Sequence, residues 1–173
     1  MIGKCGLAFL AAVLLGATPL AAATPDPVAI VRSIYDGANK RQMAFGLDAA
    51  ERKQFFSKST VALWDKAEAI SNPNGDEVGA VDFDIITNTQ GAEISSYSIV
   101  SSKIEGKTAT VVVKVVLDNW IRSSPDDDLI HYRFVLEDGR WLIDDVGNNA
   151  DGKNPTLREI LEINSRDRTR SME

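Results

Sequence analysis

The sequence predicts an α+β domain in which N-terminal helices pack on a curved, cone-like antiparallel β-sheet meander, with a short C-terminal helix at the end. Apolar residues recur at helical spacing in the first half of the chain, whereas apolar and polar residues alternate in the second half. The pair Asp138-Gly139 lies between two runs rich in aromatic and β-branched residues, which is typical of a β-hairpin. No internal repeat divides the chain, so we expect one domain.

Each of the three predicted N-terminal helices begins after a residue whose side-chain oxygen can cap it: Asp26, Asp48 and Ser57. Pro27 suits the first position of the first helix, and Glu51 gives the second a capping-box-like start before it ends near Phe56. The third helix stops before residues 72–75, a turn sequence. The predicted buried stripes are Val28, Val31, Ile34, Tyr35 and Ala38 in the first helix, and Val61, Leu63, Trp64, Ala67 and Ile70 in the third.

The second half is predicted to form the meander. One strand covers residues 93–104, and the strongest covers residues 108–120. One face of that strand is apolar: Ala109, Val111, Val113, Val115 and Leu117. A polar loop then leads to the hairpin of residues 131–146, and a C-terminal helix begins near Thr156, with Leu157, Ile160 and Leu161 directed inward.

A two-residue hairpin turn also predicts the register of the two strands. Counting from Asp138-Gly139 places Tyr132 opposite Asp145, and Arg133 opposite Asp144. One face is then apolar with Asp145 as its only charge: Tyr132, Phe134, Leu136, Trp141 and Ile143. Asp144 is predicted to lie on the other face.

The first 23 residues are predicted to be a cleaved secretory signal peptide. Lys4 supplies a positive charge, residues 7–15 an apolar core, and Ala21-Ala22-Ala23 a small-residue cleavage site. The apolar run is shorter than the roughly 20 residues that a membrane-spanning helix needs. We therefore expect a mature domain, residues 24–173, in the periplasm or secreted, with no membrane span and a charged, frayed tail from about residue 166.

Composition excludes several classes of protein. The chain has 173 residues, a formal net charge of −6 and a single cysteine, which lies in the predicted signal peptide. A cysteine-free mature domain has no disulfide and no cysteine metal site. The acidic balance argues against nucleic acid as a partner, because no basic patch is available to displace counterions. No phosphate-binding or dinucleotide-binding glycine motif is present, so no cofactor is expected. With no cysteine and a single histidine in the mature domain, no metal is expected either.

Three sequence segments resemble a known family. They are Val81-Asp82-Phe83-Asp84 with Gln90 after it, the run from Asp138 to Val146, and Leu157-Arg158-Glu159-Ile160-Leu161. Together they resemble the domain-of-unknown-function family 3828, although Gly91 stands where an acidic residue is expected. The resemblance implies a secreted or lipid-anchored bacterial protein with a fold similar to nuclear transport factor 2 and cystatin. It implies no activity.

Asp145 is the first candidate site residue, because a carboxylate on an apolar face is either satisfied by a local partner or poised as a general base. Tyr132 and Trp120 could contact a small apolar ligand near it. Asp82 and Asp84 flank Phe83 and either bind a ligand or cap a turn. The only histidine, His131, is expected on the face with Arg133 as a surface residue.

Three functions follow from these candidates. The first is a non-catalytic periplasmic or secreted binding module, with an envelope protein or a small apolar ligand as its partner. The second is a small pocket enzyme of the isomerase or dehydratase kind, with Asp145 as general base. The third is an acidic inhibitor or immunity-type protein that uses residues 126–128 against a basic enzyme.

Overall fold

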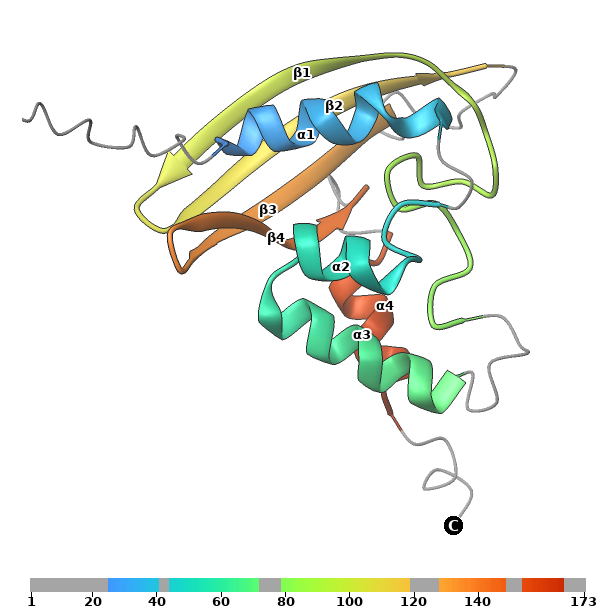
Figure 1. Cartoon of the computed structure of the whole chain (residues 1–173). Helices are drawn as coiled ribbons and strands as arrows, with labels where there is room; N and C mark the ends of the chain where they lie inside the picture. The colour runs from blue at the N-terminus through green and yellow to red at the C-terminus, as the bar shows by residue number, and fades with distance from the viewer. Residues whose placement is uncertain (1–24, 41–43, 72–78, 119–127, 149–153, 167–173) are drawn as a thin grey trace, which may run out of the picture.

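The computed structural model describes residues 25–40, 44–71, 79–118, 128–148 and 154–166. The predicted α+β class and order of elements are confirmed (Figure 1). The elements are α1 (Pro27–Asp36), η1 (Ala38–Lys40), α2 (Ala49–Phe55), α3 (Lys58–Ser71), β1 (Ile94–Glu105), β2 (Thr108–Leu117), β3 (Leu129–Glu137), β4 (Arg140–Gly147) and α4 (Leu157–Asn164). The predicted signal peptide, Trp120 and most of the predicted tail lie outside the described residues.

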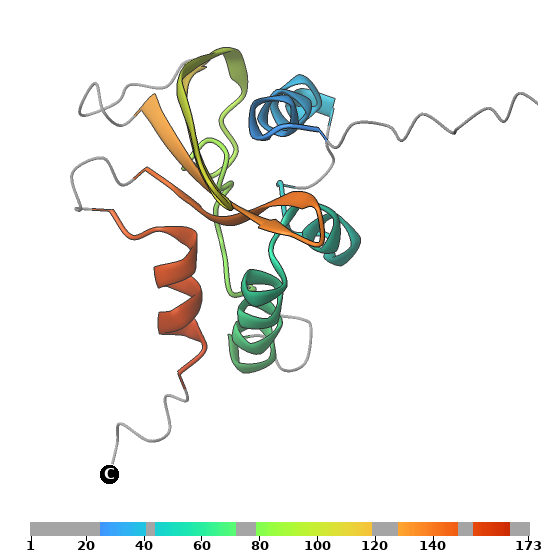
Figure 2. The same ribbon diagram turned by 90° about the vertical axis from the view of Figure 1, so that its left-hand side faces the viewer.

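The four strands form one antiparallel sheet in the order β1-β2-β3-β4, which is the predicted meander. The sheet is curved, and α1 lies across one of its faces (Figure 1). In Figure 2, α1 and α4 lie on opposite sides of the sheet. The face of β2 that was predicted to be apolar points into the core, because Ala109, Val111, Val113 and Val115 are all buried.

The predicted N-cap residues cap their helices, while Glu51, the expected capping-box residue of α2, accepts the N–H of Gly46 at 2.8 Å. Oδ1 of Asp26 accepts the Ala29 N–H at 2.7 Å, and Oδ1 of Asp48 accepts two N–H groups of the first turn of α2. Ser57 Oγ accepts the Thr60 N–H at the start of α3. Thr156 and Glu159 form a complete capping box on α4. These bonds fix where each helix begins, since the first four N–H groups of a helix have no partner within it.

Tyrosine residues link α1 to the sheet. The Tyr35 ring stacks on Tyr97 with 4.9 Å between ring centroids and meets the edge of the Tyr132 ring. The Tyr132 hydroxyl donates to the Tyr35 hydroxyl at 3.0 Å, and Tyr35 donates to the carbonyl of Ile86 at 2.9 Å. Tyr132 is therefore a core residue, buried with its hydroxyl bonded.

The β3–β4 hairpin has the predicted turn. Asp138 and Gly139 have positive φ angles of 49° and 76°, as a type I′ turn requires. From this turn the predicted pairs hold as far as Phe134 opposite Ile143.

Beyond that pair the predicted register is wrong. A β-bulge shifts the strands, so that Arg133 pairs with Asp145, and Tyr132 pairs with Val146. Asp144 becomes the extra residue. Because side chains alternate between faces, this one-residue shift moves Asp145 off the face that carries Tyr132.

The cause of the bulge lies outside the hairpin. Thr60 Oγ1 at the start of α3 donates to the carbonyl of Asp144 at 2.6 Å, and Ser57 Oγ donates to the Asp144 carboxylate at 2.7 Å. The Ser57 N–H also donates to the carbonyl of Ile143 at 2.8 Å, which joins the start of α3 to the edge of β4. These long-range bonds hold the extra residue in place.

Candidate functional site

Asp145 is buried with a full set of hydrogen bonds. Its Oδ1 accepts the N–H of Val146 at 2.9 Å and the N–H of Arg158 at 3.0 Å. Its Oδ2 accepts a charge-assisted bond from the Arg133 guanidinium. The side chain is only 1% exposed, and its two oxygens already accept from three donors. Asp145 therefore joins β3, β4 and the first turn of α4.

Asp144 is the partner of a different set of groups. Besides Ser57, its Oδ1 accepts from Ser59 Oγ at 3.1 Å and from Arg158 Nη1 at 3.3 Å. The predicted cross-strand pair between Asp144 and Arg133 is not formed. Asp144 thus connects the starts of α3 and α4.

The other candidate residues do not gather around Asp145. Asp84 closes a turn, since its Oδ1 accepts the Ile86 N–H at 3.0 Å and its backbone pairs with Thr89. Asp82 is exposed on the preceding segment. Tyr132 lies in the core, on the opposite face of the sheet from Asp145.

The described residues contain a pocket of about 390 Å³ between the hairpin tip and the start of α3. We call it the hairpin pocket. It is lined by Lys53, Phe56, Lys58, Val61, Ala62, Asp65, Glu137, Asp138, Arg140 and Leu142. Phe56 and Leu142 are buried and Val61 is half-buried, so these three give the pocket an apolar lining. Charged side chains of both signs make up most of the rest.

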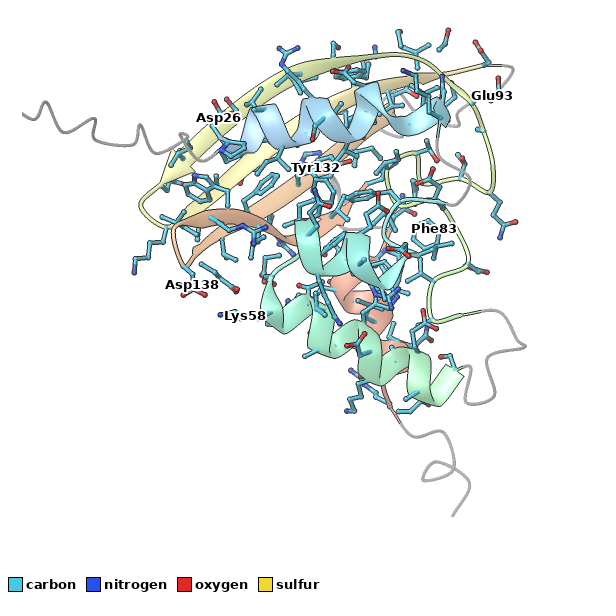
Figure 3. The ribbon with its side chains drawn as sticks, in the orientation of Figure 1. Asp26, Lys58, Phe83, Glu93, Tyr132 and Asp138 are labelled. Carbon is cyan, nitrogen blue, oxygen red and sulfur yellow. The ribbon has the colours of Figure 1, made fainter. Side chains whose placement is uncertain are left out.

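Two of these charges meet at the hairpin tip. Lys58 Nζ lies 2.6 Å from Asp138 Oδ2, and Figure 3 shows the two residues side by side. Asp138 raises the pKa of the Lys58 ammonium through this bond, and Lys58 lowers the pKa of the Asp138 carboxyl. Both groups are therefore ionised at neutral pH. Both side chains are more than three-quarters exposed, so the pair contributes little to stability.

A second pocket, of about 380 Å³, lies where α1, α2 and β4 meet. Its lining is Pro25, Ala29, Ile30, Ser33, Gln54, Phe55, Arg140 and Trp141. Arg140 lines both pockets, and its Nη2 donates to the carbonyl of Gln54 at 3.0 Å.

Sequence reasoning did not find either pocket. Their walls come from segments that are about 80 residues apart in the chain, such as Lys58 and Asp138. No local spacing marks such a site. The available signal was compositional: Lys53, Lys58 and Arg140 are charged residues next to predicted apolar positions.

The described part of the chain contains neither a metal-binding cluster nor a membrane-spanning helix. No cluster of three or more His, Cys, Asp or Glu side chains there could hold a metal ion. No helix among those residues has the length and apolar character to cross a membrane.

Comparison with known proteins gives no match: no family model fits the sequence, and no curated protein or solved structure is significantly similar to it.

Proposed function

We propose that the protein is a secreted, non-catalytic binding module that takes a small ligand in the hairpin pocket. The observation that carries this proposal is the pocket itself. Its volume of about 390 Å³ and its combination of apolar walls with charged groups are typical of small-molecule sites. The ligand would have an apolar body against Phe56, Val61 and Leu142.

The charges around the pocket suggest how such a ligand would be oriented. Lys53 and Arg140 carry positive charges on its lining, and Lys58 is already paired with Asp138. An acidic group on an otherwise apolar ligand would meet Lys53 and Arg140, neither of which forms an ion pair among the described residues. Glu137 lies opposite Arg140 in the hairpin, so Lys53 is the cation further from a cross-strand carboxylate. We expect an amphipathic anion to bind better than a neutral molecule of the same shape.

The enzyme alternative receives less support. A general base needs access to the proton that it removes, and Asp145 is buried with three donors around it. The inhibitor alternative stays a prediction, because residues 126–127 lie outside the described part of the chain.

Filling the pocket should block ligand binding. Ala62 is exposed on α3 and lines the pocket, so Ala62→Phe places a ring in the pocket without entering the core. The probe is the amphipathic dye 8-anilinonaphthalene-1-sulfonate, followed by fluorescence titration. We expect Ala62→Phe to raise its dissociation constant at least about tenfold, which corresponds to about 1.4 kcal/mol.

Ala69→Phe is the matched control. Ala69 is also exposed on α3 but does not line the pocket. This variant should bind the dye as the unmodified protein does. Equal affinity of the Ala62→Phe variant and the unmodified protein would contradict the proposed location of the ligand.

We also propose that the protein is secreted and that it resembles the domain-of-unknown-function family 3828. Secretion is supported by the order of Lys4, the apolar residues 7–15 and the alanines at 21–23. On expression of the full chain in a Gram-negative bacterium, we expect the protein in the periplasmic fraction with Thr24 as its N-terminal residue, as read by Edman sequencing. Replacing Ala21 and Ala23 with arginine should leave uncleaved chain. Recovery of an intact Met1 N-terminus from the cytoplasm would contradict the proposal.

A further inference from the structure

A third pocket, which is polar, lies on the face of the sheet opposite the buried face of β2. We call it the outer-face pocket. Its volume is about 160 Å³, and it is lined by Thr110, His131, Arg133, Asp145, Val146, Gly147 and Thr156. Gly147 brings β4 close to α4, because a Cβ there would lie 3.0 Å from Thr156 Cα. Gly147 and Thr156 therefore form one wall of the pocket.

Arg133 offers free hydrogen-bond donors at this pocket. Its guanidinium is tethered by the buried Asp145, yet the Arg133 side chain is 61% exposed. One nitrogen, Nη2, is used by Asp145, and the remaining N–H groups have no partner within the described residues. An arginine held in this way loses little conformational entropy when it binds an anion.

Thr110 and His131 extend the set of donors. Thr110 lies directly opposite Arg133 in the β2–β3 register and is exposed. Nε2 of His131 is buried with no hydrogen-bond partner among the described residues, so the accessible nitrogen of the ring is Nδ1. Burial lowers the pKa of His131, which keeps the ring neutral at pH 7. An anion bound at Nδ1 would select the tautomer with its proton on that nitrogen, which is then a donor.

Charge and size restrict the ligand. The charges of Arg133 and Asp145 offset each other, so a singly charged anion fits the pocket better than a dianion, which Asp145 would repel. A volume of about 160 Å³ holds only a few non-hydrogen atoms. A carboxylate is planar and matches the fork of an arginine.

We propose that the outer-face pocket binds the carboxylate group of a small organic acid, with Arg133, Thr110 and His131 as its donors. This site is separate from the hairpin pocket, and neither proposal depends on the other.

The test uses His131 as a reporter, because it is the only histidine in the chain. Its ring resonances are followed by NMR at pH 7 while acetate is added at constant ionic strength. We expect a saturating shift with a dissociation constant on the order of 1 mM, which suits a ligand of four non-hydrogen atoms. Chloride should cause no saturating shift, and inorganic phosphate should bind about tenfold more weakly than acetate.

Three variants show whether the named donors bind the anion. Arg133→Lys keeps a cation beside Asp145 but loses the paired N–H groups of the guanidinium. Thr110→Val removes the hydroxyl and keeps a side chain of similar size. Each should weaken acetate binding, by roughly 2-fold to 10-fold for the loss of one hydrogen bond. Lys114→Gln is the control, since Lys114 is an exposed cation on the same face that does not line the pocket.

Several results would overturn the proposal. One is a shift that stays linear with acetate concentration or that chloride reproduces. Another is a Lys114→Gln effect as large as that of Arg133→Lys, which would indicate general electrostatic attraction. Phosphate binding more tightly than acetate would exclude the carboxylate class.

Discussion

Asp145→Ala is expected to lower the free energy of unfolding by about 3 kcal/mol. The substitution leaves the N–H groups of Val146 and Arg158 without their acceptor in a buried position. Each buried, unpaired donor costs about 1–3 kcal/mol. The guanidinium of Arg133 adds little to this cost, because its side chain is 61% exposed and water can solvate it. Urea denaturation followed by circular dichroism measures the change.

Two variants separate burial from charge. Asp145→Asn keeps an oxygen for the two N–H groups but replaces the oxygen that accepts from Arg133 with an amide NH2; because the Arg133 side chain is largely exposed, the variant should cost about 1 kcal/mol. Asp144→Ala should also cost about 1 kcal/mol. Its carboxylate is 29% exposed, so the partners that it leaves have more access to water. If Asp144→Ala proved as destabilising as Asp145→Ala, the bulged register would not describe the protein in solution.

Trp64→Ala is expected to be at least as destabilising, at about 3–5 kcal/mol. Trp64 is fully buried, and its ring meets the edge of Phe56 with 5.6 Å between centroids. The Arg52 guanidinium lies 5.2 Å from the Trp64 ring centroid, and the Trp64 N–H donates to Glu68 at 3.0 Å. Truncation creates a cavity beside α2 and α3 that these neighbours cannot fill.

Trp141→Ala is the matched control for this prediction. Trp141 is only half-buried, in the pocket where α1, α2 and β4 meet. Because part of its surface is already in water, Trp141→Ala should lower the free energy of unfolding by about half as much as Trp64→Ala, or less. Far-UV circular dichroism is the suitable signal, since both variants change the tryptophan fluorescence. Equal losses for the two tryptophans would contradict the burial that the structure gives them.

The hairpin shows where sequence reasoning works and where it fails. Asp138-Gly139 predicts the turn correctly, because the two positive φ angles depend on those two residues alone. The predicted strand register is correct near the turn and wrong beyond Phe134, because the bulge depends on hydrogen bonds from Ser57 and Thr60. Those residues lie more than 80 positions away in the chain.

The same division applies to the candidate sites. The sequence predicts an ordinary surface histidine at position 131, and the structure places it in a pocket, with one ring nitrogen that is buried and has no hydrogen-bond partner in the described part of the chain. Asp145 was predicted beside Tyr132, and the structure places it on the other face with Arg133. The bulge at Asp144 moves Asp145 to the outer face of the sheet, and Thr156, which lies against Gly147, forms one wall of the pocket that contains His131.

Local sequence patterns are sufficient to predict the N-cap residues, the hairpin turn, the buried face of β2 and the order of helices and strands. Each of these depends on residues within a few positions of one another, so local physical preferences decide them. The bulge at Asp144, the burial of Asp145 and the two proposed sites become visible only in the folded chain. These depend on groups far apart in the chain, and their position follows from packing and hydrogen bonding that no local pattern specifies.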